Sequence, residues 1–275
     1  MKLGKIWAVY FSGTGTTRRT VERIARGIAS RLNLPAESVD FSRPAVRQET
    51  LGFGEKDLVV FGTPVYAGRV PNVLLPFLRE RIVGGGALAV PVVLFGNRNY
   101  DDALIELRNI LAADGMHPIA AGAFVGEHSF SRVLGANRPN AEDEALMDEF
   151  AARVAALAAG LDATPVKSVA VRGQEPLRPY YTPRDRAGNP INILKVKPKT
   201  DMSRCGGCGL CANLCPMGSI DPTDVSAVRG ICIKCCACVK GCPTGAKFFD
   251  DAGYLYHQHE LEAQYARPAE NALFV

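Results

Sequence analysis

The sequence predicts an α/β protein, in which an open, doubly wound sheet of five parallel strands is followed by a small α+β unit. Two observations indicate this fold. Up to about residue 160, short apolar runs alternate with helical patterns, as in chains that form a parallel sheet with helices on both faces. All nine cysteines lie between Cys205 and Cys242, which indicates a second unit organised around metal.

Length and composition divide the chain into four segments. A chain of 275 residues exceeds the usual size of one domain. We assign residues 1–160 to the sheet domain, 161–198 to a proline-rich linker, 199–252 to the cysteine-rich domain and 253–275 to a C-terminal tail. The linker is expected to cross the surface of the sheet domain, anchored by Tyr180 and Tyr181. In the tail we expect a short helix at 260–265, with His257 and His259 at the surface.

The formal net charge of +4 does not identify a partner. Cysteines that bind metal are deprotonated, so metal centres make the loaded protein more acidic than its sequence. No run of Lys and Arg with interleaved aromatic residues suggests nucleic acid. The N-terminus lacks the features of a signal peptide, and no apolar stretch reaches the roughly 20 residues that a membrane helix needs. We therefore expect a soluble, cytoplasmic protein with soluble partners.

The first element is expected to be a buried strand at residues 5–11, followed by a turn and a helix. The turn consists of small and hydroxyl residues: Ser12, Gly13, Thr14, Gly15, Thr16 and Thr17. Such a turn favours an anion, because free backbone N–H groups and the helix dipole point to one place. Arg18 stands where a dinucleotide fingerprint needs its last glycine, and no Gly-Lys-Ser/Thr P-loop is present. The alternative is an N-cap with a tight turn and no ligand.

Two further strands are expected at residues 37–41 and 57–62, of which the second is strongly apolar. A helix is expected from Pro71 to Glu80, because proline suits the first turn of a helix. The loop between the apolar strand and this helix contains Pro64, Val65, Tyr66, Ala67 and Gly68.

The fourth and fifth strands are expected at residues 88–95 and 118–125, and helices at 101–113 and 141–159. Asp101 and Asp102 suit the positive end of the first of these helices as well as a ligand contact. The loop after the fourth strand contains Gly96, Asn97, Arg98 and Tyr100, and the fifth strand is followed by Glu127, His128 and Ser129. All these loops follow the carboxyl ends of parallel strands, where open α/β sheets bind ligands.

The cysteines form two runs of the spacing C-x2-C-x2-C-x3-C-P. In bacterial ferredoxins this spacing holds two clusters, and the fourth cysteine of each run ligates the other cluster. The sequence therefore predicts two [4Fe–4S] clusters, one on Cys205, Cys208, Cys211 and Cys242, the other on Cys232, Cys235, Cys238 and Cys215. Zinc ribbons use C-x2-C pairs, and disulfides need a secretory context. Cys236 fits neither run and is expected to be a buried free thiol.

The sheet domain resembles the flavodoxins in its first loop, where residues 12–17 match the pattern [ST]-x-T-G-x-T. Thr16 stands where flavodoxins often carry Asn. The resemblance implies the strand order 2-1-3-4-5 and an FMN whose single phosphate lies in this loop. It also implies that Tyr66 stacks on the flavin ring, that the flexible peptide at Gly68 meets N5, and that the loop with Asn97, Arg98 and Tyr100 approaches the polar edge of the ring.

The whole chain resembles the flavodoxin–ferredoxin fusion proteins of anaerobic bacteria and archaea, in both halves and in the linker motif Y-Y-T-P-R-D-R-A-G-N-P. The resemblance implies a low-potential carrier that passes electrons between two clusters and FMN and exchanges them with soluble redox proteins. The alternative is an FMN-dependent reductase of a small substrate, for which Tyr66, Tyr100 and His128 are the available proton donors. A redox sensor is a third interpretation, for which we find no recognition motif. The sequence leaves open which cluster faces the flavin.

Overall fold

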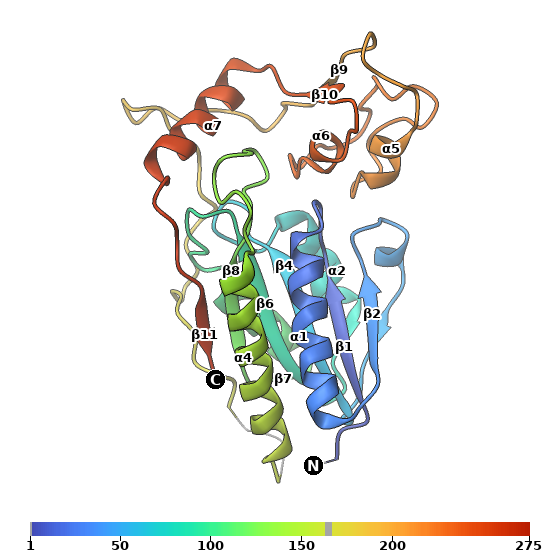
Figure 1. Cartoon of the computed structure of the whole chain (residues 1–275), viewed down its shortest axis with the longest axis vertical. Helices are drawn as coiled ribbons and strands as arrows, with labels where there is room; N and C mark the ends of the chain where they lie inside the picture. The colour runs from blue at the N-terminus through green and yellow to red at the C-terminus, as the bar shows by residue number, and fades with distance from the viewer. Residues whose placement is uncertain (1, 163–166) are drawn as a thin grey trace.

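The computed structural model describes residues 2–162 and 167–275, so that positions 163–166 of the predicted linker lie outside the described residues. Its main sheet contains five parallel strands in the order β2-β1-β4-β6-β8, which is the predicted order (Figure 1). The strands are β1 (Lys5–Tyr10), β2 (Ala36–Asp40), β4 (Asp57–Pro64), β6 (Leu88–Phe95) and β8 (Ala121–Val125). Their carboxyl ends meet at one edge of the sheet.

Two short strands that the sequence did not predict extend this sheet to seven. β7 (His117–Pro118) pairs with the start of β6, so the predicted fifth strand is split and its second part is β8. β11 (Ala272–Phe274) pairs antiparallel with β8, with Ala272 opposite Ala123. The C-terminal segment is therefore part of the sheet edge and is not a tail with a helix alone.

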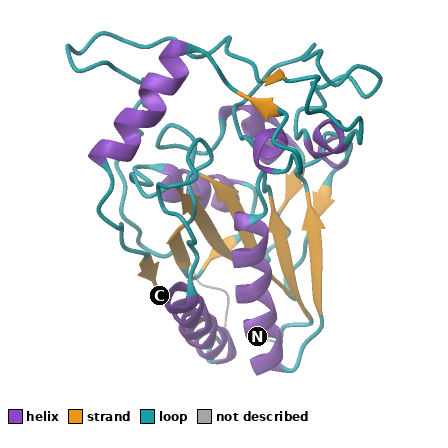
Figure 2. Ribbon diagram, turned by 45° about the horizontal axis from the view of Figure 1, so that its top comes forward, coloured by secondary structure: helices purple, strands orange, loops and turns teal. Residues whose placement is uncertain are grey.

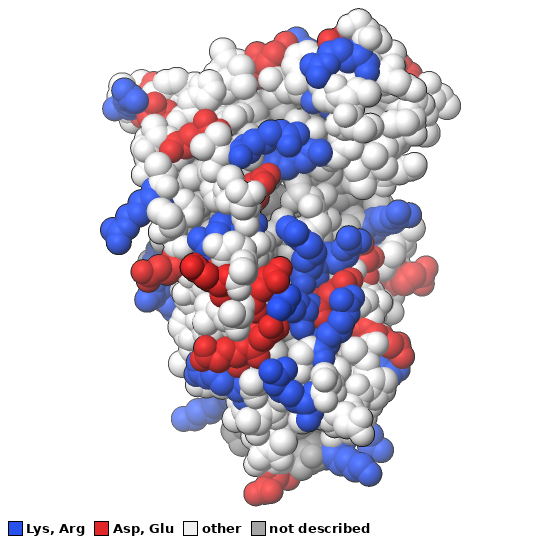
Figure 3. Space-filling view, viewed as in Figure 1, with Lys and Arg blue, Asp and Glu red and all other residues white. Residues whose placement is uncertain are grey.

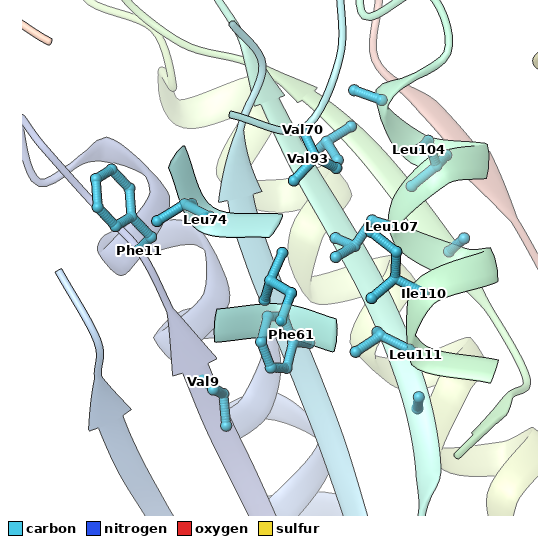
Figure 4. Close-up of a cluster of buried hydrophobic side chains, with 14 of the residues drawn as sticks. Val9, Phe11, Phe61, Val70, Leu74, Val93, Leu104, Leu107, Ile110 and Leu111 are labelled. Atoms are coloured by element: carbon cyan, nitrogen blue, oxygen red, sulfur yellow. The ribbon is translucent and has the colours of Figure 1, made fainter. Parts of the chain in front are cut away.

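Helices cover both faces of the sheet, as Figure 2 shows. On one face α1 (Thr16–Leu32) and α4 (Ala141–Ala159) pack over a core that includes Ile6, Ile24 and Phe150. On the other face lie α2 (Leu75–Glu80) and α3 (Ala103–Ala113). Figure 4 shows the core beneath them, where side chains of β1, β4 and β6 meet those of α3. Successive side chains of the buried strands point to opposite faces of the sheet, so each strand contributes to both cores.

Two helices of the sheet domain begin later than the sequence predicts. The helix expected at Pro71 begins as the 3-10 turn η2 (Asn72–Leu74) before α2, and the one expected at Asp101 begins at Ala103. The sheet domain also contains a second 3-10 turn, η1 (Val46–Gln48). It contains one further strand pair, β3 (Leu51–Gly52) with β5 (Ile82–Val83).

The cysteine-rich half lies over the carboxyl edge of the sheet (Figure 1). It contains β9 (Lys199–Thr200), α5 (Leu210–Leu214), α6 (Ala237–Lys240), β10 (Lys247–Phe248) and α7 (Ala252–Gln264). α7 is longer than the helix expected at 260–265. His257 on α7 is only 6% exposed, so the expectation that it lies at the surface was wrong, whereas His259 is exposed.

The described part of the linker runs over the sheet domain. The Val169 N–H donates to the Pro118 carbonyl at 2.8 Å, and the Tyr181 N–H donates to the Ala67 carbonyl at 2.8 Å. The Tyr180 hydroxyl donates to the Val70 carbonyl at 2.8 Å. Both tyrosines therefore anchor the linker, as expected.

The face drawn in Figure 3 mixes charges of both signs over α1 and α4. Arg23 of α1, for example, pairs with Glu144 and Asp148 of α4 at 2.8 Å and 2.6 Å. Within the described residues, no helix combines the length and the apolar character that crossing a membrane requires.

Candidate functional site

The first loop opens the N-terminus of α1. Gly15 is the N-cap in the left-handed conformation, with φ 87°, and it offers no side chain to the first turn. Ser12 closes the base of the loop, because its hydroxyl accepts from the Arg18 N–H at 3.2 Å and its own N–H donates to the Ser42 hydroxyl at 2.7 Å. The helix thus presents its positive end without an acidic residue in the first turn. This is the arrangement that favours a phosphate.

The second loop is a tight turn whose strands are held together by two backbone hydrogen bonds. The Tyr66 N–H donates to the Arg69 carbonyl at 3.0 Å, and the Arg69 N–H donates back at 3.1 Å. Between them Ala67 and Gly68 have φ of 51° and 78°, the values of a type I′ turn. Ala67 adopts a conformation that favours glycine, so the surrounding contacts hold this turn in place.

The third loop uses its side chains differently from the prediction. Asn97 is buried and faces the C-terminal segment, donating to the Tyr265 and Arg267 carbonyls at 2.6 Å and 3.0 Å. Tyr100 is buried against Phe95, with ring centroids 5.5 Å apart. Of these three predicted side chains, Arg98 is the one that lines a cavity between the loops.

Arg98 makes two contacts that fix its position. It forms an ion pair with Asp101, and its guanidinium lies 4.7 Å above the ring centroid of Tyr181 in the linker. Asp102 is fully buried and accepts from the backbone N–H groups of Gln174 and Arg178 at 3.0 Å and 2.8 Å. The two aspartates thus position an arginine and the linker.

Two adjoining cavities lie between the three loops. The first, called here the loop cavity, measures about 500 Å³ and is lined by Gly13, Thr14, Thr16, Thr17, Pro64, Val65, Tyr66, Leu94, Phe95, Gly96, Gly126, Glu127, His128, Ser129 and Cys235. The second, called the roofed cavity, measures about 920 Å³ and shares Val65, Tyr66, Gly96, His128 and Ser129 with the first.

The structure brings most of the predicted flavin-binding residues to these cavities. Ala67, Gly68 and Arg98 line the roofed cavity in addition to the residues of the loop cavity. Four predicted residues line neither cavity: Ser12, Gly15, Asn97 and Tyr100. Glu127, His128 and Ser129, expected at the cleft or at the domain seam, do line the loop cavity.

The roof of the second cavity comes from segments that follow the sheet domain. It is formed by Tyr181, Pro183, Ile193, Leu194, Ile233, Lys234, His257 and Leu261. The sequence offers no local signal for a site in these residues, because their position depends on how the linker, the cysteine-rich half and α7 fold back. Only the spacing of Tyr254, His257 and Leu261 on α7, all buried, could have indicated an inward helix face.

His128 sits where the two cavities meet. Burial, followed by the positive charges of Lys240 and Arg98 and by His257, lowers its pKa to about 3. Its Nδ1 accepts from the Phe130 N–H at 3.1 Å. The ring is therefore neutral at physiological pH. Burial likewise raises the pKa of Tyr66 well above its ordinary value, and the nearby thiols of Cys235, Cys236 and Cys232 add to that rise.

The cysteines surround two cavities of their own. The inner cysteine cavity, of about 370 Å³, is lined by Cys215, Cys232, Cys235 and Cys238 together with Cys236. The outer cysteine cavity, of about 560 Å³, is lined by Cys205, Cys208, Cys211 and Cys242. These are the two sets that the crossed spacing predicts. Among the described residues, no group of three or more His, Cys, Asp or Glu side chains is gathered for a single metal ion.

The two crossing cysteines have matching surroundings. The Ser219 N–H donates to Cys215 Sγ at 3.3 Å, and the Ala246 N–H donates to Cys242 Sγ at 3.2 Å. Such N–H donors favour the thiolate, the form that binds metal. Cys236, in contrast, is buried with its sulfur 3.3 Å from the Tyr254 hydroxyl.

Two basic side chains join the halves of the molecule at this site. Lys240 of α6 forms an ion pair with Glu127 and donates to the carbonyls of His128 and Ser131 at 2.7 Å and 2.8 Å. Arg47 of the sheet domain donates to the Pro216 carbonyl at 2.6 Å. One contact lies beside the loop cavity and the other follows the crossing ligand Cys215, so together they fix the inner cysteine cavity against the sheet domain.

The inner cysteine cavity and the loop cavity are neighbours. Cys235 lines both of them. A Cβ atom built on Gly13 would lie 3.1 Å from the Cβ of Cys235, so only glycine permits this approach without a shift. The four cysteines of the outer cavity line neither the loop cavity nor the roofed cavity.

Two family models match parts of this chain. The family model for a flavodoxin domain matches residues 8–102, and that for a 4Fe-4S binding domain matches residues 198–221, which contain the first cysteine run. None of the curated proteins matches the chain.

Three solved structures illustrate the similarity. A flavodoxin from the domain Archaea shares 17% identity over 56% of this chain and 97% of that chain, with a TM-score of 0.42. The rubredoxin oxygen:oxidoreductase of Desulfovibrio gigas shares 17% over 59% of this chain and 38% of that chain, with a TM-score of 0.37. A variant Fusobacterium nucleatum flavodoxin bound to flavin mononucleotide shares 15% over 54% and 93%, with a TM-score of 0.35. On the two domain matches, the chain is a fusion of a flavodoxin domain with a 4Fe–4S binding domain, a combination for electron transfer with flavin and iron–sulfur centres.

Proposed function

We propose that this protein is an intramolecular electron carrier, in which two [4Fe–4S] clusters and one FMN exchange electrons and connect soluble redox partners. FMN can hold one or two electrons, and each cluster transfers one at a time, so the set links one-electron and two-electron chemistry.

The loop and roofed cavities fit FMN. Thr14, Thr16 and Thr17 line the loop cavity at the positive end of α1, which suits a phosphate. Val65, Tyr66 and Phe130 line the roofed cavity and provide apolar and aromatic surface for a planar ring. The close approach of Gly96 supports this fit, because a Cβ there would lie 2.4 Å from His128 Cδ2 and close the space between the loops.

The two cysteine cavities fit one cluster each. Each holds the four thiols that a [4Fe–4S] cluster requires, and each crossing thiol receives a backbone N–H. Ile220 is buried at the inner cavity and would exclude water from a cluster there. The second cysteine run thus supports a second cluster in addition to the one that the 4Fe-4S domain indicates.

The position of Cys235 is the observation that carries the proposal. Because this cysteine borders both the inner cavity and the loop cavity, a cluster bound there would adjoin the FMN site. The outer cluster would lie on the far side, where Cys208 and Leu210 are exposed to solvent. We therefore order the centres as outer cluster, inner cluster and FMN, with electron exchange at the outer cluster.

The same site gives little support to a reductase. His128 is neutral at physiological pH because of its lowered pKa, and Tyr66 retains its proton because burial raises its pKa. Tyr100, the third predicted proton donor, does not line the cavities.

The test is anaerobic reconstitution of the full chain with iron, sulfide and FMN. We expect about one FMN and about eight iron atoms per chain, as two four-iron clusters require. Flash reduction of the clusters by a photochemical donor should then bleach the flavin at a rate that does not depend on protein concentration. Absence of bound FMN, or a rate proportional to concentration, would refute the intramolecular carrier.

A further inference from the structure

The two cysteine runs share an unusual backbone but differ in the residues that adopt it. The third and fifth positions of the first run are Gly207 and Gly209, both left-handed with φ of 67°. In the second run the same positions are Lys234 and Cys236, with φ of 56° and 58°. Residues with a Cβ adopt this conformation at a cost in free energy that glycine does not bear. The second run therefore bears that cost at the two places where the first run avoids it.

The contacts of both side chains show what distinguishes the second run. Cys236 is buried, with its sulfur 3.3 Å from the Tyr254 hydroxyl of α7, so it joins the cysteine loop to that helix. Lys234 instead extends along the roofed cavity, which it lines together with Leu194. Its ammonium group donates to the carbonyls of Leu194 and Cys232 at 3.1 Å and 2.9 Å.

The hydrogen-bond acceptors of Lys234 are neutral. Both of its acceptors are backbone carbonyls, which orient the ammonium group without cancelling its charge. Arg98, a second cation on the roofed cavity, differs because Asp101 neutralises it. Lys234 thus contacts the loop of Cys232, a predicted ligand of the inner cluster, and lines the proposed flavin site. At such a partly buried position, a charge acts more strongly on its neighbours than it does in water.

We propose that Lys234 is a tuning residue, which stabilises the electron-rich form of FMN and so draws electrons from the inner cluster toward the flavin. The inference rests on the proposed function and deepens it. Reduction adds negative charge to the flavin, and a fixed cation at the cavity wall favours that charge. The first run lacks such a side chain, and its cluster site does not border the flavin site. This explains why a lysine occupies a position that otherwise favours glycine.

The test compares variants of the reconstituted, FMN-loaded full chain by anaerobic optical redox titration of the flavin. Lys234→Gln removes the charge and keeps a polar side chain that is one atom shorter, whereas Lys234→Arg keeps the charge. Lys234→Gly restores the residue of the first run and relieves the backbone. Lys195→Gln removes an exposed charge from the same region and serves as the matched control.

We expect Lys234→Gln and Lys234→Gly to lower the preference for reduced over oxidised FMN about tenfold, a fall of about 30 mV for a two-electron couple. Lys234→Arg and Lys195→Gln should keep the wild-type potential, and Lys234→Gly should unfold at a denaturant concentration no lower than wild type. An unchanged potential in both uncharged variants, with FMN and iron retained, would overturn the inference and leave the carrier intact. If wild-type protein binds no FMN, the proposed function itself fails, and the inference fails with it.

Discussion

Gly13 of the first loop faces Cys235 of the second cysteine run, and a Cβ atom at Gly13 would lie 3.1 Å from the Cβ of that cysteine. A glycine of the proposed phosphate loop thus faces a cysteine that lines the inner cysteine cavity. We therefore expect a single position to affect both the fit of FMN and the seating of the inner cluster.

Substitution of Gly13 by valine tests this contact. The added side chain meets Cys235 and, at 3.6 Å, the Tyr66 hydroxyl, so the loop must shift. We expect FMN to bind at least about tenfold more weakly, a loss of about 1.4 kcal/mol. Fluorescence titration of the apoflavin protein with FMN measures this. Gly52→Val is the control, because a Cβ at Gly52 meets nothing within 4 Å. Equal affinities in both variants would argue against the loop as the phosphate site.

The two crossing cysteines should have different effects on electron transfer. Cys215→Ala removes a ligand of the inner cavity, and Cys242→Ala removes one of the outer cavity. Each variant should lose up to about half of the iron. Flavin reduction by the clusters should be lost in Cys215→Ala, whereas Cys242→Ala should keep rapid exchange between the inner cluster and FMN. Iron analysis and flash kinetics measure both effects. The opposite pattern would place the outer cluster next to the flavin.

Lys240 should stabilise the contact between the two halves. Lys240→Met removes an ion pair with Glu127 and two hydrogen bonds to carbonyls, and we expect a loss of about 1–3 kcal/mol. Lys199→Met is the control, because Lys199 makes a single, more exposed ion pair with Asp250 that contributes about 0–1 kcal/mol. Urea unfolding of the holoprotein, followed by cluster absorbance, compares the two. A smaller loss in Lys240→Met than in the control would contradict the role of this contact.

His128 should make the fold sensitive to mild acid. Its pKa is about 3 in the folded protein and about 6.5 in the unfolded chain, so the unfolded state binds more protons between these values. The stabilising contribution is complete above pH 6.5 and is lost as the pH falls toward 3, with a slope of at most about 1.4 kcal/mol per pH unit. His128→Gln should flatten the loss of stability between pH 6.5 and 5.5, as measured by urea unfolding. The exposed His259→Gln should leave it unchanged. Identical slopes in all three proteins would show that the pKa of His128 is the same in the folded and unfolded states.

The features that the sequence predicted correctly depend on local pattern. The order of the parallel strands follows from alternating apolar runs and helices together with the flavodoxin resemblance, and the two cysteine sets follow from spacing alone. Within each strand–helix unit and each cysteine run, the residue types and their intervals carry the information.

The features that the sequence missed depend on contacts between distant segments. Asn97 occupies the predicted flavin loop, yet its amide binds carbonyls of Tyr265 and Arg267, far along the chain. Lys234 lies between two cysteines, so the sequence suggests only that it belongs to a cluster loop. In the structure it lines the roofed cavity. Neither role has a local signature, because each arises only when the C-terminal half folds back over the sheet.

β11 changes how the cysteine-rich half is attached. The chain leaves the flavodoxin sheet after α4 and returns to the same sheet at β11, where Asn271 accepts from the Val125 N–H at 2.8 Å and donates to Asp143 at 2.6 Å. The cluster half is thus an insertion with two tethers. If the linker were cut once, the cluster half would remain attached to the sheet through α7 and β11. We therefore expect the two halves to keep their relative position after such a cut.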